Sequence, residues 1–174
     1  LVYPSRLAGV TLDTKDVAYY TLDSAGEITR LILRGVTGDL DQYGVITEIA
    51  KTENDYAASY TYTVDLGGVK STLGNVRASG IITAGGFAKR ELLDGTTRIT
   101  SLKQIVLSSI NDTSATAGNV TYPVSSGVMV YVARSGEYYI SNLSAVKSGY
   151  RLTAYYDAPA REGGRIRVVV AVKE

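Results

Sequence analysis

The stretch that decides the fold occurs twice in this 174-residue chain. Ala18–Leu31 reads AYYTLDSAGEITRL, and Ala154–Val169 reads AYYDAPAREGGRIRVV. Each copy has an alanine and two tyrosines, then polar turn residues with glycine, then an apolar run. Aromatic and β-branched runs joined by such turns are typical of β-hairpins. We therefore predict two hairpins of one design.

The second half of the first copy is ambiguous on its own, because Ile28, Leu31 and Ile32 also fit one face of a helix. The later copy resolves the ambiguity. Arg165–Val172 reads RIRVVVAV, is dense in valine and follows a glycine pair. β-Branched residues favour a strand, so we predict strand–turn–strand in both copies.

The likeness extends upstream of each hairpin. Leu12–Tyr20 and Leu143–Tyr156 both place a leucine, a short polar turn with lysine and then a strand. The copies are offset by 136 positions, from Tyr19 to Tyr155, and a fainter echo lies at Asp94–Leu102. A unit that recurs while the residues expected at its surface differ between the copies indicates a repeated structural element. We therefore interpret the repeat as structural.

Short strands separated by turn signals indicate a sandwich or barrel. We predict an all-β fold of small β-barrel or sandwich modules built from repeated hairpins, with little helix. Gln104–Ile110 fits either a strand or the end of a short helix, and Ser109–Asn119 is predicted to be a linker or a long loop. Helical turns are expected near Ala145–Lys147 and Leu102–Val106. The other predicted strands are Gly44–Ile49, Ser59–Asp65, Ile81–Thr83, Val128–Val132 and Gly136–Ile140.

Two domain arrangements are compatible with the repeat. In the first, residues 1–110 form one β module and residues 111–174 a second. In the alternative, residues 1–38 and 111–174 form one pseudo-symmetric barrel, with residues 39–110 inserted. We predict the tandem arrangement.

The charges nearly cancel, with 18 lysines and arginines against 17 acidic residues, and the two signs are interspersed. A nucleic-acid or anionic-membrane surface needs a basic excess on one face, so we expect neither partner. A membrane-spanning segment needs about 18 consecutive apolar residues, and the sequence has no such run. Because the chain begins Leu-Val-Tyr without a signal peptide, we expect it to be a piece of a longer protein.

The chain contains no cysteine and no histidine. This excludes disulfides, the usual zinc sites, thiol nucleophiles and imidazole-based triads. Gly38–Gly44, GDLDQYG, begins like a calcium loop, but Tyr43 and Ala50 occupy ligand positions, so we interpret it as a polar turn. The glycine pairs at 84–86 and 162–164 read as hairpin turns. We expect no catalytic residue, metal or cofactor.

Paired carboxylates are the remaining catalytic possibility, since a glycosidase needs two at a fixed separation. Nothing in the sequence singles out two of them, so a hydrolase is the third choice. The candidates are Glu48, Glu53, Asp55, Asp65, Glu91, Asp94, Asp157 and Glu162.

Tyrosine dominates the aromatic residues, with 14 Tyr, one Phe and no Trp. Adjacent tyrosines in a strand point to opposite faces, so each doublet directs one ring inward and one outward. The outward rings cover sheet surface or form a ligand platform. The platform candidates are Tyr20, Tyr139 and Tyr156.

The sequence resembles regions of cell-surface proteins from Gram-positive, clostridia-like bacteria that also carry S-layer homology modules. The likeness runs from about Asp16 to Val172. It rests on LILRGVTGDLDQYGVITEI (Leu31–Ile49), YTYTVDLGGV (Tyr60–Val69), NLSAVKSGY (Asn142–Tyr150) and TAYYDAPAREGGRIRVVVAV (Thr153–Val172). The resemblance implies export, anchoring to the cell wall through modules elsewhere in the protein, and an extracellular structural or binding role.

We therefore expect a non-catalytic structural or interaction module of a bacterial cell-surface protein, located outside the cell at the wall. Its expected partners are cell-wall or surface-layer components, glycans or proteins, and it should not insert into a membrane. The alternative is a carbohydrate-binding module that serves a polysaccharide-acting enzyme.

Overall fold

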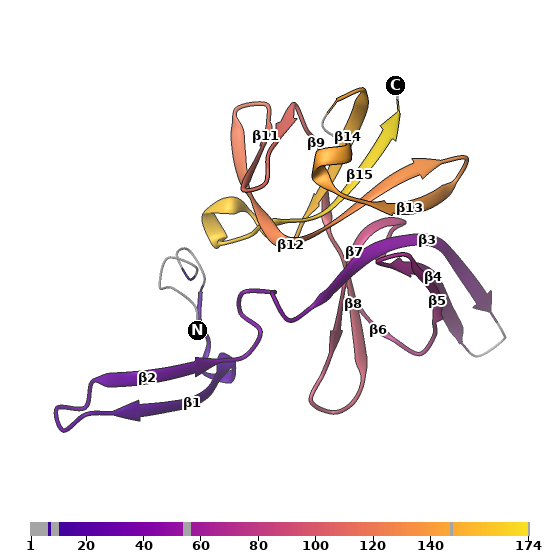
Figure 1. The fold of residues 1–174 in the computed structure, drawn as a ribbon. Coiled ribbons are helices and arrows are strands. Elements are labelled where there is room, and N and C mark those ends of the chain that lie inside the picture. The colour runs from indigo at the N-terminus through magenta and orange to yellow at the C-terminus, as the bar shows by residue number, and fades with distance from the viewer. Residues whose placement is uncertain (1–6, 8–10, 54–56, 147, 174) are drawn as a thin grey trace.

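The computed structural model describes residue 7 and residues 11–53, 57–146 and 148–173. The fold is all-β, with 61% strand in three sheets that include a curled half-barrel, which confirms the predicted fold class (Figure 1). The described residues contain no α-helix, only single 3-10 turns, among them η2 (Thr14–Asp16), η3 (Leu143–Val146) and η4 (Ala160–Glu162).

The first sheet is the hairpin of β1 (Val17–Leu22) and β2 (Ile28–Leu33), which projects from the rest of the molecule (Figure 1). Its antiparallel register places Tyr19 opposite Ile32. At the repeat offset, Tyr155 pairs with Val168 across β14 and β15. The two sequence copies are therefore both antiparallel hairpins with the same cross-strand pair.

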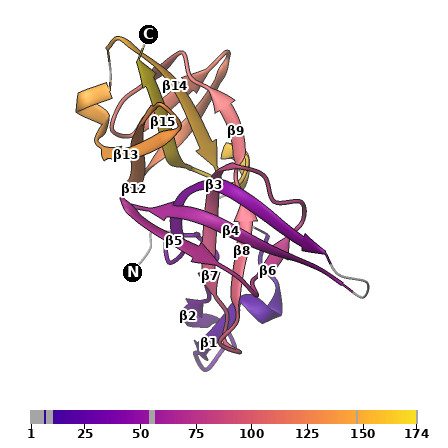
Figure 2. The same cartoon turned by 90° about the vertical axis from the view of Figure 1, so that its right-hand side faces the viewer.

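The second sheet has six strands in the order β5-β4-β3-β7-β8-β6. Neighbouring strands are antiparallel, except that β6 runs parallel to β8. The outer parts of β3 and β4 extend beyond the other strands (Figure 2). The strands are β3 (Gln42–Glu53), β4 (Ala58–Leu66), β5 (Val69–Leu73), β6 (Arg77–Ser79), β7 (Gly85–Glu91) and β8 (Thr97–Ser101).

The third sheet has seven strands in the order β10-β11-β12-β15-β14-β9, with β13 paired to β12. The long strand β12 pairs with β11 in its first half and with β13 in its second half, and it runs parallel to β15. The strands are β9 (Lys103–Val106), β10 (Ser109–Ile110), β11 (Ser114–Ala117), β12 (Val120–Arg134), β13 (Glu137–Ser141), β14 (Tyr150–Tyr156) and β15 (Ile166–Lys173).

The two large sheets pack through a buried apolar cluster. Val45 of the six-stranded sheet meets Tyr131, Val168 and Val170 of the seven-stranded sheet, beside Leu102. The Tyr155 ring lies against Gly85 and Gly86, where a Cβ at Gly85 would come within 2.9 Å of the ring hydroxyl. The glycine pair predicted as a hairpin turn therefore begins β7 and allows the two sheets to approach closely.

Two local predictions, of a strand and of a linker, were wrong. Ile81–Thr83 lies outside any strand, and the Thr83 amide donates to Ser101 Oγ instead. The predicted linker Ser109–Asn119 contains the β10–β11 hairpin, whose turn is satisfied by Asn111 Oδ1 accepting from the amides of Thr113 and Ser114. Small polar residues that bond to their own backbone make a tight turn as readily as a linker.

Helix was also expected in two places. Most of Leu102–Val106 is strand β9, because Thr153–Tyr156 of β14 pairs with it. Near Ala145–Lys147 the chain forms the 3-10 turn η3, which ends at Val146, and Lys147 lies outside the described residues.

The change of sheet falls at Leu102, since β8 ends at Ser101 and β9 begins at Lys103. Strands β9 and β10 precede residue 111 and belong to the seven-stranded sheet, while β1 and β2 form a sheet of their own. Independent folding of the two segments, which the predicted division at residue 110 requires, stays a prediction.

Candidate functional site

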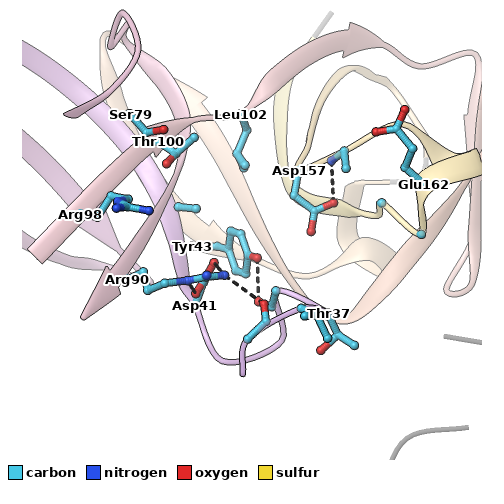
Figure 3. A pocket seen from close by; sticks show the side chains of 17 residues that line it. Thr37, Asp41, Tyr43, Ser79, Arg90, Arg98, Thr100, Leu102, Asp157 and Glu162 are labelled. Atoms are coloured by element: carbon cyan, nitrogen blue, oxygen red, sulfur yellow. Dashed lines mark hydrogen bonds and ion pairs between the residues drawn. The ribbon is translucent and has the colours of Figure 1, made fainter. Parts of the chain in front are cut away.

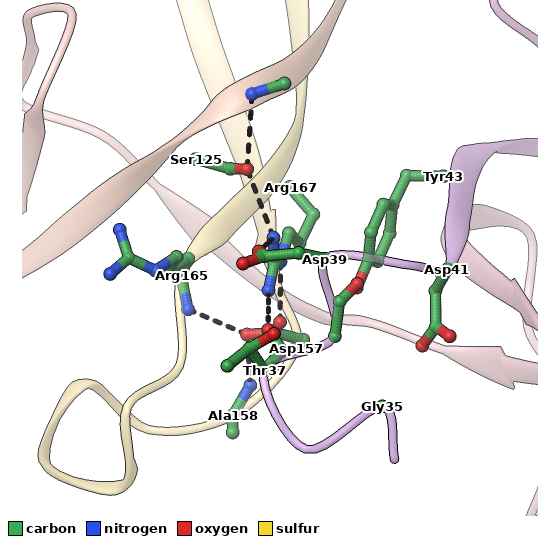
Figure 4. A network of polar contacts seen from close by, with 12 residues as sticks. Gly35, Thr37, Asp39, Asp41, Tyr43, Ser125, Asp157, Ala158, Arg165 and Arg167 are labelled. Carbon is green, nitrogen blue, oxygen red and sulfur yellow. Dashed lines mark hydrogen bonds and ion pairs between the residues drawn. The ribbon is translucent and has the colours of Figure 1, made fainter. Parts of the chain in front are cut away.

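A buried arginine is the centre of the main polar cluster (Figure 4). Arg167 interrupts the valine-rich strand β15, and its side chain is only 2% exposed. Its Nε donates to Asp157 Oδ2 at 2.6 Å, and one terminal nitrogen donates to Asp39 Oδ1 at 2.8 Å and to Ser125 Oγ at 3.1 Å. The other terminal nitrogen donates to the Thr37 carbonyl. These contacts supply the partners that a buried charge requires.

Asp157 is held in place by backbone donors. It follows the end of β14, and its Oδ1 accepts from the amides of Ala158 and Arg165 at 2.9 and 2.7 Å. One carboxylate oxygen therefore closes the β14–β15 turn, while the other pairs with Arg167. This aspartate, which the sequence offered as a catalytic candidate, joins two strands of one sheet.

The loop from Arg34 to Asp41, called here the clamp loop, connects the projecting hairpin to β3. Gly38 in this loop has a φ of +67°, and a Cβ there would come within 2.8 Å of the Tyr43 hydroxyl and 2.9 Å of Arg167. Tyr43 donates to the Gly38 carbonyl at 2.7 Å, and its ring centroid lies 5.0 Å from the Arg167 guanidinium carbon. Only glycine fits this position without strain.

A second arginine holds both ends of the clamp loop, whereas Arg167 binds its middle. Arg90 of β7 binds Asp41 through two nitrogens at 2.6 and 2.9 Å, and it donates to the Gly35 carbonyl at 3.1 Å. Two-point pairing fixes orientation as well as distance. Arg90 therefore ties the clamp loop to the six-stranded sheet, while Arg167 ties it to the seven-stranded sheet.

Burial and neighbouring charges shift the pKa values of Arg167, Arg90 and Tyr43 in opposite directions. Burial disfavours the Arg167 charge, but its bond to Asp39 and the charge of Asp157 outweigh burial, so the pKa is raised. The bond to Asp41 raises the pKa of Arg90. Burial raises the pKa of Tyr43, although the Arg167 charge opposes this shift. Both arginines are thus held in the charged state that the clamp needs.

A cavity of about 290 Å³ lies beside this cluster (Figure 3). Its walls are the clamp loop, strands β7 and β8, and the turn from Asp157 to Gly164. Asp41 and Asp157 line it, but their oxygens are already bonded to Arg90 and Arg167. The arrangement is therefore suited to joining the two sheets and the clamp loop.

A further polar contact joins the large sheets away from the cavity. The Tyr131 hydroxyl on β12 donates to the Asp65 carbonyl at 3.1 Å and accepts from the Gly67 amide at 2.8 Å. Burial raises the pKa of Tyr131 to about 12, although the bond from the Gly67 amide opposes the shift. At the surface, Lys70 pairs with Glu137 across the same two sheets.

The predicted platform tyrosines lie in different surroundings. Tyr20 of β1 and Tyr139 of β13 are 55% and 56% exposed. Tyr156 of β14 is half-buried, with its ring centroid 5.0 Å from that of Tyr122. The three side chains belong to two separate sheets, so the structure does not gather them, and ligand binding by any of them stays a prediction.

The acidic residues of GDLDQYG occupy the clamp loop as ion-pair partners. Asp39 binds Arg167 and Asp41 binds Arg90. Among the other carboxylates, Glu91 pairs with Lys89 and Asp94 with Arg77 at the surface, and Asp55 lies outside the described residues. Sequence reasoning missed Arg167, although an arginine between an isoleucine and three valines in a strand signals a buried charge that must be paired.

Within the described ranges, no group of three or more acidic side chains is arranged to hold a metal ion. The described part of the chain also has no helix of the length and apolarity that crossing a membrane requires. No protein-family model, curated protein or solved structure matches the chain.

Proposed function

We propose that this chain is a non-catalytic structural or interaction module of a bacterial cell-surface protein attached to the cell wall or surface layer. The observation that carries the proposal is the use of two paired arginines, one of them buried. Arg167 and Arg90 bind the clamp loop to the two large sheets. The hairpin that precedes this loop projects from the molecule with apolar side chains exposed. Two sheets joined in this way support the projecting hairpin, which is the part that would contact a partner.

The interactions of the clamp favour load transfer between the hairpin and both sheets. A pull on the hairpin reaches β7 through Asp41 and β15 through Asp39. Charge-assisted bonds to arginine are stronger than neutral ones and fix geometry. This suits a module that must hold its orientation while a partner is attached.

The proposed setting follows from the resemblance to cell-surface proteins. The module is exported and lies outside the cell, where its partners are wall or surface-layer components, glycans or proteins. The near balance of 18 basic and 17 acidic residues supports the proposal that nucleic acid is not a partner. Insertion into a membrane is not part of the proposed role.

Cosedimentation tests this proposal. Purified protein is mixed with isolated cell walls of a clostridial bacterium, once with and once without their surface-layer proteins, and the bound fraction is measured. We expect retention by at least one preparation and no release of reducing sugar or amino groups over time. Retention by neither preparation, or steady release of soluble wall fragments, would contradict the proposal.

A carbohydrate-binding module is the second candidate, favoured by the exposed rings of Tyr20 and Tyr139. Exposed tyrosine rings are suited to packing against sugar faces. Affinity gel electrophoresis with soluble wall polysaccharides tests this candidate. It predicts retarded migration of the native protein and loss of retardation in Tyr20→Ala or Tyr139→Ala, with Tyr19→Ala as a matched control.

A further inference from the structure

The two faces of the projecting hairpin differ in chemistry. Residues paired across an antiparallel ladder point to the same side, and the register pairs Tyr20 with Leu31 and Leu22 with Ile28. With Ala18, which lies two residues before Tyr20, they form a side without charge, named here the apolar face. The opposite side carries Tyr19, Thr21, Arg30 and Ile32.

The apolar face is open to solvent. Tyr20, Leu22 and Ile28 are 55%, 51% and 59% exposed, and Leu31 is 39% exposed. Tyr20, Ile28 and Leu31 line a shallow groove of about 500 Å³, which Ala18 and Tyr19 also line. A two-stranded hairpin is marginal in water unless its apolar side packs on another element, and apolar patches of this kind mark interaction sites.

The later copy of the repeat shows what kind of surface covers this face. At the repeat offset, Ala18 and Tyr20 correspond to Ala154 and Tyr156 of β14. Both belong to the apolar cluster that includes Ala115 of β11 and Val124 of β12, and Tyr156 contacts the Tyr122 ring at 5.0 Å. The cover is another part of the same curled sheet, and it is made of tyrosine and small aliphatic residues.

The apolar face itself has this composition, because it consists of one tyrosine, one alanine, two leucines and one isoleucine. It is therefore a chemical match for its own copy in another molecule. We propose that two copies of the chain associate through their apolar faces, giving a two-layer sandwich of four strands around a two-fold axis. Tyr20 and Leu31 oppose each other at the middle of the face, so the axis passes near them. This inference rests on the proposed interaction function and names its partner.

The exposed area indicates a weak association. A fully buried aromatic side chain contributes roughly 150–250 Å². The four half-exposed large side chains of this face, one of them aromatic, therefore offer at most ~100 Å² each and ~800 Å² for two copies. Stable complexes bury about 1,200–2,000 Å². The dimer should therefore form at high protein concentration, or where molecules are crowded on one surface.

Sedimentation velocity over a range of protein concentrations tests the proposal. The mass should rise from 18.6 kDa toward twice that value as concentration increases. Ile28→Lys places a charge on the apolar face and should raise the dissociation constant at least ~10-fold. Ile32→Lys, in the same strand but on the opposite face, is the matched control and should leave association unchanged. Equal loss in both variants, or a monomer at every concentration, overturns the proposal.

Cross-linking locates the contact without relying on a charge. The chain has no cysteine, so a Tyr20→Cys variant can form a disulfide only with another molecule. Mild oxidation should give a covalent dimer of Tyr20→Cys, and little dimer from Ile32→Cys on the other face, which lies outside the groove. Equal yields overturn the assigned face. A monomeric protein that still binds walls refutes this inference alone, whereas a dimer that binds no wall preparation refutes the proposed wall-binding function alone.

Discussion

Replacing Arg167 by methionine should lower the free energy of unfolding by about 3 kcal/mol. Removing one partner of a buried ion pair costs about 3–5 kcal/mol, because the other charge is left buried. The Arg167 side chain is 2% exposed, but Asp157 and Asp39 are 20% and 39% exposed. Water can therefore reach the remaining carboxylates, which places the cost at the lower end. Methionine fills much of the arginine's volume, so a cavity adds little.

Urea and thermal unfolding measure this effect. For a domain of this size a loss of 1 kcal/mol lowers the melting temperature by about 2–4 °C, so a fall of about 6–12 °C is expected. The triple variant Arg167→Met, Asp39→Asn, Asp157→Asn removes the stranded charges and should recover most of the loss. A single-variant loss below ~1 kcal/mol, or a triple variant no more stable than the single, would refute the reasoning.

Three further predictions concern the other contacts between elements. Gly86→Ala should destabilise the fold by about 2 kcal/mol, because a Cβ would overlap the Tyr155 ring. The control Gly127→Ala, whose Cβ would have no atom within 4 Å, should change the free energy of unfolding by no more than ~0.5 kcal/mol. Urea unfolding measures this free energy for both variants. Tyr131 should lose its stabilising effect as the pH rises from about 10, its ordinary pKa, to about 12, its pKa in the fold. Stability measured at about pH 9, 10.5 and 12, which spans this window, should fall less steeply in Tyr131→Phe, and parallel curves would argue against this. Arg90→Lys loses two-point pairing with Asp41. The backbone amides of Gly38 and Asp41 should therefore exchange with deuterium faster, while the amides of β15 exchange at an unchanged rate. Faster exchange at all of these amides would indicate general destabilisation instead.

The strands were largely predictable because their signals are local. The Ala-Tyr-Tyr repeat predicted two hairpins, and both form with the same cross-strand pair, Tyr19 with Ile32 and Tyr155 with Val168. Valine-rich and tyrosine-rich runs favour strands wherever they occur. The repeat did not indicate that one copy is exposed and the other buried, because that difference depends on which strands lie beside each copy.

The clamp was not predictable, because its partners lie far apart in the sequence. Asp39 and Arg167 are 128 residues apart, and no local pattern links them. GDLDQYG begins with the predicted polar turn and continues into β3 at Gln42, yet the reason for its two aspartates lies in β7 and β15. The linker prediction at Ser109–Asn119 was wrong for a related reason: polar composition does not show whether a neighbouring strand will pair with a segment.

The long reach of the Arg167 contacts has a consequence for biosynthesis. Thr37 and Asp39 leave the ribosome well over a hundred residues before their arginine partner, with separations of 130 and 128 positions. Contacts of such long range form late, because loop closure costs entropy before any bond repays it. A nascent chain can therefore complete the six-stranded sheet and the Arg90 contacts to Gly35 and Asp41 while Thr37 and Asp39 still lack their partner. Arrival of the last strand supplies Arg167, so a truncated polypeptide would have its clamp loop tied to one sheet instead of two.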